Sequence, residues 1–178
     1  MFLLFKKKYT QEQLIQFYKN EITNTNNLFL SDMWNLSEKD KETKHDYIQW
    51  MFPTKEKSDF NRHAPVLESI DIEILKDSRV VMSNMRKSIC VFLDFLGFIL
   101  NDDNNICMQE EFETKSKNWL KPNNHNFKRI SRLLTFMKLF GFDDIYNNFF
   151  KTLEELYEKY PEIIGEKAYN YWKSTKEL

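Results

Sequence analysis

The sequence predicts an all-α fold: a single compact multi-helix domain over residues 1–178, with a central buried helix at about 78–96. Apolar residues recur at spacings of three and four along most of the chain, which is the period of a helix that buries one face. Only 3 of the 178 residues are glycine and 4 are proline, too few for the many turns of an all-β fold or for linkers between domains. No useful length of chain alternates apolar and polar residues as a half-buried strand does.

The first predicted helix begins at Thr10. Its hydroxyl and the Gln13 amide fit a capping box, in which each side chain satisfies a backbone N–H at the helix start. The apolar spacing continues to about residue 22, where the polar run TNTNN breaks it. Residues 28–34 are short and apolar, so they suit either an extended connector or one helical turn.

A second helix is predicted from Ser37, a favourable N-cap, to Phe52. Its first half is charged and is expected to face solvent, whereas its second half carries an apolar stripe that includes Trp50. The helix should end at Phe52, because Pro53 disfavours helical geometry in the residue before it. Residues 53–66 then form a long connecting loop.

The longest periodic segment, at about 78–96, is predicted to be the central helix, preceded by a short helix at 71–76. Beyond Cys90 nearly every residue is apolar, which is typical of a helix buried on most sides. Gly97 is expected to end it in the left-handed conformation.

The rest of the chain is predicted to be helical apart from a solvated turn at 101–105. Apolar stripes at helical spacing are followed by Gly141 and Pro161, which end helices. Asn124 or Asn126 is expected to cap the helix that Gly141 ends. The predicted helices lie at about 107–120, 124–141, 143–160 and 163–175.

Composition predicts a soluble protein of the cytoplasm. The net charge of −1 provides no general attraction to nucleic acid or anionic lipid. Cys90 and Cys107 have the spacing of neither a disulfide framework nor a redox motif, which favours a reducing compartment. The short apolar run at the start precedes the lysines, the reverse of a signal peptide. The apolar window 91–100 contains Asp94 and is too short to span a bilayer. Peripheral membrane association and oligomeric state stay open.

Five stretches in a fixed order resemble one known family. They are QFYKNEI at 16–22, HDYIQWMFP at 45–53, SDFNRHAP at 58–65, MRKSICVFLDFLGF at 85–98 and NHNFKRISRLLTFMKLFGF at 124–142. Together they resemble the conserved region of the opioid growth factor receptor family, over about residues 10–150. The resemblance implies a helical intracellular receptor for opioid peptides of the enkephalin type, and therefore a surface that binds a peptide or protein segment.

We expect such a segment to dock near the corner at residues 47–53. The candidate ligand contacts are His45, Gln49, Trp50, Asn61, Asn126 and Arg129. Each has a structural alternative. The position of Trp50 on the apolar stripe favours a place in the core. His45 and Gln49 lie one helical turn apart and suit hydrogen bonds that pin the connecting loop around Asn61, because a long loop needs partners for its backbone groups.

Asp94 is the one charge in its apolar window. A buried carboxylate needs a cation or several donors, so we expect a structural ion pair with Arg86, or with Arg129 or Arg132 from the helix at 124–141. The alternative is an enzyme that uses Asp94 as a general base. No second catalytic group accompanies it in the pattern, and the chain has neither a glycine-rich phosphate loop nor a nucleophile turn. We therefore do not expect an enzyme.

A basic flank on the helix at 126–140 is the candidate for binding nucleic acid. Its residues are Lys128, Arg129, Arg132 and Lys138. A recognition helix for DNA or RNA would need a larger basic patch and a positive domain charge, and the sequence has neither. Nucleic-acid binding therefore stays an alternative, and we expect a solvated face instead.

Metal ligands are present by residue type but not by spacing. The candidates are His45, His63, His125 and Cys107. No pair of them falls at the short, regular intervals of a zinc site. We expect no metal and no cofactor.

Overall fold

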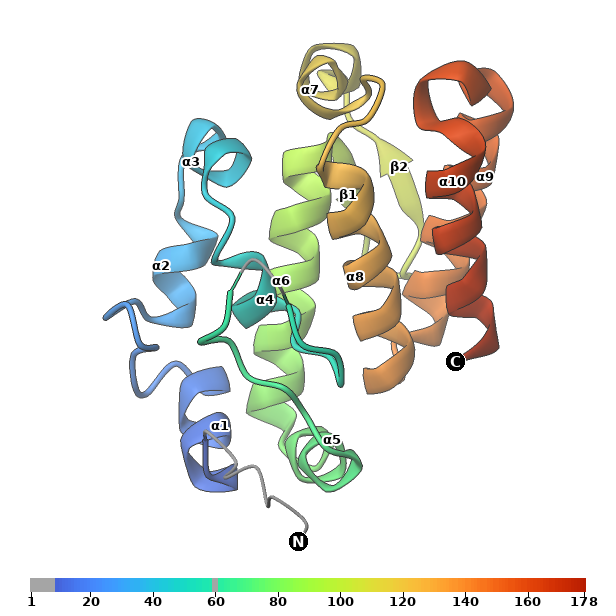
Figure 1. The fold of residues 1–178 in the computed structure, drawn as a ribbon. Helices are drawn as coiled ribbons and strands as arrows, with labels where there is room; N and C mark the ends of the chain where they lie inside the picture. The colour runs from blue at the N-terminus through green and yellow to red at the C-terminus, as the bar shows by residue number, and fades with distance from the viewer. Residues whose placement is uncertain (1–8, 59–60) are drawn as a thin grey trace, which may run out of the picture.

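The structure, a computed structural model, describes residues 9–58 and 61–178. The prediction about a signal peptide concerns residues 1–8 and lies outside them. The helices are α1 (Gln11–Tyr18), α2 (Leu30–Trp34), α3 (Glu38–Thr43), α4 (Ile48–Met51), α5 (Ser69–Lys76), α6 (Arg79–Leu96), α7 (Phe112–Trp119), α8 (Asn126–Phe140), α9 (Asp143–Lys159) and α10 (Pro161–Ser174), with a closing 3-10 turn at Thr175–Glu177. The predicted all-α class is confirmed (Figure 1).

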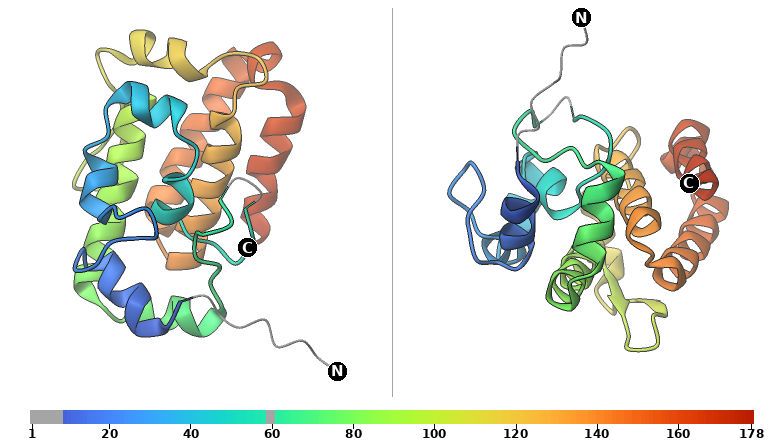
Figure 2. Two further views of the ribbon diagram at one scale, coloured as in Figure 1. Left: turned by 60° about the vertical axis from the view of Figure 1, so that its left-hand side comes forward. Right: turned by 90° about the horizontal axis from the view of Figure 1, so that it is seen from below.

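The helices form layers on either side of α6. Helices α1 to α4 lie on one side, and α8 followed by α9 and α10 lies on the other, as two perpendicular views agree (Figures 1 and 2). Helix α5 crosses one end of α6, and α7 crosses the other. The expected central buried helix is therefore present. In the described residues no helix has both the length and the apolar character needed to cross a bilayer.

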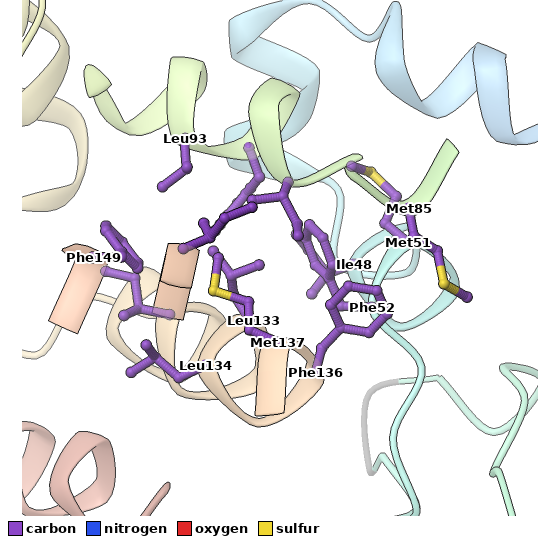
Figure 3. Packing of buried hydrophobic residues seen from close by; sticks show 14 of the residues in the cluster. Ile48, Met51, Phe52, Met85, Leu93, Leu133, Leu134, Phe136, Met137 and Phe149 are labelled. Carbon is purple, nitrogen blue, oxygen red and sulfur yellow. The ribbon is translucent and has the colours of Figure 1, made fainter. Parts of the chain in front are cut away.

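The core is an aromatic and aliphatic cluster centred on the inner face of α6. Met85, Ile89 and Phe92, at spacings of four and three, are completely buried. Phe52, at the end of α4, contacts both neighbouring layers: its ring centroid lies 5.6 Å from that of Phe92 on α6 and 5.3 Å from that of Phe136 on α8. Figure 3 shows Phe52 and Phe136 in this position. The side chain before the proline thus joins three helices.

The predicted helix caps form as expected in most places. Thr10 and Gln13 make both bonds of the capping box. Gly97 ends α6 at φ 92°, and a Cβ there would lie 3.0 Å from the Phe112 ring, so the position requires glycine. The cap predicted for α8 was wrong: its N-cap residue is His125, which makes no capping bond with its side chain, and Asn126 is already the first helical residue. Asn124 lies before the cap, and its Oδ1 accepts from the backbone N–H of Asn126 at 2.8 Å.

Three element predictions were wrong. The first helix, expected to continue to about residue 22, ends at Tyr18, and Asn20 just after it is in the left-handed conformation at φ 67°. The helix expected at 37–52 is divided into α3 and α4 by non-helical backbone at Lys44. The helix expected at 107–120 begins only at Phe112, because Ile106–Met108 is strand β2, paired antiparallel with β1 (Phe98–Leu100). Three-residue strands are too short to show alternation, so the pattern used to detect strands could not reveal this hairpin.

The central packing predicts a large cost for truncating α6 on its inner face. Phe92→Ala should lower the free energy of unfolding by about 3–5 kcal/mol, because it leaves a cavity between Phe52 and α6. Val80→Ala is the control on the same helix, since Val80 is 54% exposed, and should change stability by less than about 0.5 kcal/mol. Urea unfolding followed by circular dichroism measures both, and equal losses would contradict a core centred on this face.

Candidate functional site

An open pocket of about 670 Å³ lies between the loop after α4, the N-terminal half of α8 and the side of α10. Helix α8 contributes the residues of one face, at spacings of three and four: Lys128, Arg129, Ser131, Arg132 and Thr135. The α4 side contributes His45, Ile48, Gln49, Thr54, Glu56, Lys57 and Ser58. Asn123, Asn124 and His125 close one end, and Tyr171 of α10 lies at the rim. Loop and helix together make a concave site.

Arg129 forms the inner wall of the pocket and connects α8 to α3 and α4. It is only 7% exposed. One terminal nitrogen donates to the Lys41 carbonyl at 2.7 Å and to Asn126 Oδ1 at 3.0 Å. The other donates to the Lys44 carbonyl at 2.6 Å and to His45 Nδ1 at 3.3 Å. Since a guanidinium can only donate, Nδ1 of His45 accepts and the imidazole proton is on Nε2.

These bonds explain why the chain breaks between α3 and α4. The last carbonyls of a helix have no partner within the helix, and a buried one needs a donor. Arg129 supplies donors to Lys41 and Lys44, and the Tyr47 hydroxyl donates to the Lys41 carbonyl as well, at 2.8 Å. Burial lowers the pKa of Arg129, and Tyr47 and Glu42 oppose that shift. The buried cation is therefore held mainly by neutral oxygens.

A polar network extends from Arg129 to the end of the pocket. Asn126 is completely buried and donates to a Glu42 carboxylate oxygen at 2.8 Å. The other Glu42 oxygen lies 3.6 Å from His125 Nε2, and the His125 ring meets the His45 ring edge-on at 5.0 Å. Burial, then the charge of Arg129, lowers the pKa of His125; Glu42 opposes this and His45 adds to it. The network favours neutral His125.

Arg132 is half-buried and faces the pocket one turn after Lys128. Its Nε donates to the Phe52 carbonyl at 2.8 Å, which satisfies an acceptor next to Pro53. Its terminal nitrogens have no hydrogen bond or ion pair within residues 9–58 and 61–178. Burial lowers the pKa of Arg132 to about 10, with Tyr18 and Glu56 opposing the shift. One edge of the guanidinium is thus fixed by the Nε bond, whereas the two terminal nitrogens make no hydrogen bond within the described residues.

The other predicted ligand residues make contacts within the protein itself. Trp50 is 2% exposed and belongs to the core, as its stripe position favours. Asn61 pins the connecting loop: its amide donates to the Asp46 carbonyl at 2.7 Å, and its oxygen accepts from the backbone of His63 and Ala64. With its amide turned so that both ends are satisfied, Gln49 donates to the His45 and Asp46 carbonyls and accepts from the Ser58 hydroxyl at 3.2 Å.

The expected buried ion pair of Asp94 was wrong. The Asp94 side chain is 60% exposed and pairs with Lys115 at 3.2 Å. Arg86 donates instead to Asn101 and Asn104 in the turn between the strands, and Arg132 to Phe52. The apolar window concealed the helical period, which puts position 94 on the exposed face of α6.

From the sequence, Arg132 was expected to form an ion pair with Asp94, and Tyr171 was not recognised as a pocket residue. The signal for Arg132 was present in the basic flank of α8, because Lys128 and Arg132 share a face with Ser131 and Thr135. Lys138 does not join them and pairs with Asp143 at 3.2 Å. Nothing local marks Tyr171, because its place at the rim depends on how α10 packs on α8.

A protein-family match covers most of the chain. The family model described as "Opioid growth factor receptor (OGFr) conserved region" matches residues 7–176. The chain belongs to the opioid growth factor receptor family. The matched range includes α9 and α10, so the family region is longer than the 10–150 expected from the motifs.

The family's curated members are much longer proteins. The mouse opioid growth factor receptor is 35% identical over 126 residues, which are 67% of this chain and 20% of the mouse protein. The human receptor is 30% identical over 126 residues, 18% of its length. The mouse opioid growth factor receptor-like protein 1 is 26% identical over 168 residues, 90% of this chain and 36% of that protein. The chain thus spans about a fifth of the receptors it matches. No solved structure matches it.

The bonds of Arg129 predict that its removal destabilises the fold. Arg129→Met should lower the free energy of unfolding by about 3 kcal/mol, because the buried Lys41 carbonyl and Asn126 and the partly buried Lys44 carbonyl each lose a donor. Lys138→Met on the same helix is the control and should cost less than about 1 kcal/mol, since it removes a surface ion pair. Urea denaturation compares the two, and similar losses would be evidence against a structural role for Arg129.

The lowered pKa of His125 predicts loss of stability in weak acid. As pH falls through 6.5, the unfolded histidine takes up a proton more readily than the folded one, so the unfolded state binds more protons and unfolding becomes easier. His125→Gln removes this contribution, and its free energy of unfolding should fall less steeply between about pH 7 and pH 5.5 than that of the wild type. Urea titrations across this range test it; parallel curves for the two proteins would refute it.

Proposed function

We propose that the chain is a binding module that receives a peptide or protein segment in the pocket between residues 54–58 and α8. The observation that carries the proposal is an open concave site whose walls are positioned by the hydrogen bonds of buried side chains. Its volume of about 670 Å³ lies within the ~300–1,000 Å³ common for ligand sites. Membership in a receptor-named family supports the same role.

The pocket is organised in advance of binding, which limits the entropy that binding costs. Arg129 and Asn126 fix the α3–α4 corner to α8. Asn61 and Gln49 hold the connecting loop at two further points. A segment that enters would meet a rigid wall on one side and a pinned loop on the other.

The rim contains an aromatic anchor suited to a peptide. Tyr171 is 54% exposed although it is a large side chain. Exposed tyrosines next to concave sites are frequent energetic centres of protein recognition, because the ring buries area at a low entropy cost. Similar proteins are named opioid growth factor receptors, so an opioid peptide of the enkephalin type is the first ligand to try.

The proposal assigns no catalytic chemistry and no nucleic-acid binding. Asp94, the carboxylate that an enzyme would use, does not line the pocket and is paired with Lys115. The basic flank of α8 is divided: Arg129 is buried, while Lys138 lies outside the pocket. With a net charge of −1, a broad phosphate-binding surface is not favoured. We also propose the cytoplasm as the location, since Cys90 and Cys107 are free thiols.

Filling the pocket should abolish binding. Peptides would be selected from a random display library on the wild-type protein, and the strongest, together with an enkephalin-type peptide, titrated while amide shifts are followed. Ser131→Trp places a large side chain in the pocket and should weaken binding at least about tenfold. Ser83→Trp, on the exposed face of α6, is the matched control and should leave affinity unchanged. Shifts distant from the pocket, or equal affinity in both variants, would overturn the proposal.

A further inference from the structure

We infer that the pocket selects a peptide that carries a carboxylate, an Asp or Glu side chain, and that the terminal nitrogens of Arg132 bind it. The inference rests on the proposed function and specifies the chemistry of the ligand. It follows from the state of one arginine, from the charges around it and from the polar groups beside it.

Arg132 has the geometry of a prepared carboxylate receptor. Its Nε bond to the Phe52 carbonyl fixes one edge of the planar guanidinium. The two terminal nitrogens, which make no other hydrogen bond in the described residues, remain as a pair of donors. A pair of parallel N–H groups matches the two oxygens of a carboxylate. The half-buried setting strengthens such a contact, because surrounding protein replaces water.

The charges that line the pocket favour an anion. The cationic lining residues are Lys57, Lys128, Arg129 and Arg132. Glu56 is the one acid among the lining residues that the structure describes, and it forms no ion pair with Arg132 there, although its charge partly opposes the lowering of the Arg132 pKa by burial. Among the described lining residues the cations outnumber the acids, and a concave site concentrates the field of its charges on whatever enters it. The cost of leaving Arg132 partly desolvated would be offset by a ligand anion.

A hydroxyl group can complete the site. Thr135 lines the same pocket three residues after Arg132 and is half-buried. Its hydroxyl has no hydrogen bond within the described ranges. A carboxylate has more acceptor sites than one guanidinium can satisfy, so a neighbouring hydroxyl donor is suited to the remaining oxygen lone pairs.

The surroundings favour a peptide acid over a nucleic acid. Among the described lining residues, Arg132 is the one half-buried arginine whose terminal nitrogens make no hydrogen bond, and Tyr171 at the rim gives a surface for an apolar neighbour of the acidic residue. Nucleic acids are bound through several phosphate contacts spread over a basic surface. Arg129, the neighbouring arginine on α8, donates to the Lys41 and Lys44 carbonyls, so its terminal nitrogens are already used and cannot supply a second phosphate contact.

The test compares acid with amide in the ligand and arginine with glutamine in the protein. Selected peptides would be synthesised in matched pairs, with Glu or Asp replaced by Gln or Asn, and titrated by calorimetry. The wild type should bind the acidic member at least about tenfold more tightly. Arg132→Gln should reduce this ratio to about one. Arg86→Gln is the control, because Arg86 also donates to a loop carbonyl, that of Asn101, but lies outside the pocket; it should keep the ratio.

Each other outcome overturns one specific claim. If Ser131→Trp blocks binding but acid and amide peptides bind the wild type equally, the carboxylate inference fails and the binding pocket stands. If no peptide binds in the pocket, the proposed function itself fails. Equal loss of both peptides in Arg132→Gln would assign Arg132 to the scaffold alone. Tighter binding of inorganic phosphate than of the acidic peptide would overturn the assignment to a carboxylate.

A second variant guards against misfolding of Arg132→Gln. Lys128→Gln changes an exposed side chain one turn away, so the fold should be retained. Loss of its charge should lower the acid-to-amide ratio part of the way, and added salt should narrow the difference between this variant and the wild type. An unchanged ratio in Lys128→Gln at low salt would contradict a cationic pocket.

Discussion

The guanidinium of Arg129 holds together the two segments from which the candidate site is built. It donates to the Lys41 and Lys44 carbonyls from a helix more than eighty residues further along the chain. Without these bonds the Lys44 carbonyl would lose its arginine donor and the buried Lys41 carbonyl would keep only the Tyr47 hydroxyl, which is costly where water is partly excluded. The corner, in turn, sets the direction in which α4 enters the core and in which the following loop returns to α8.

The two most distinctive family strings are physical partners. HDYIQWMFP contributes His45, which accepts from Arg129, and Tyr47, whose ring faces the same guanidinium at 5.6 Å. Its Phe52 contacts Phe136 through the ring and Arg132 through the carbonyl. NHNFKRISRLLTFMKLFGF supplies the other half of each contact. The occurrence of both strings in one chain therefore has a structural reason, because each completes the hydrogen bonds and packing of the other.

The polar residues at the site fall into two groups, one that makes structural hydrogen bonds and one that is accessible from the pocket. Asn61, Asn126 and Arg129 are buried, and their bonds are made to the protein itself. By contrast, the terminal nitrogens of Arg132 make no hydrogen bond within the described residues, and the Tyr171 side chain at the pocket is 54% exposed. Most of the predicted ligand residues belong to the first group. Polar side chains near a core stripe are recognisable in a sequence, but whether their donors are already used depends on distant backbone groups.

The sequence by itself determined the helical class, the buried face of α6, the stop at Gly97 and the family, because helical periodicity, caps and motifs are local properties. Only the tertiary structure decided the break at Lys44, the hairpin after α6 and the pocket. At the break, local propensity favours a continuous helix, and donors from Arg129 outweigh it. The position of Asp94 was also decided by tertiary packing, because an apolar stretch of sequence does not reveal which face of α6 the neighbouring helices bury. A site made by contacts between distant segments exists only after folding.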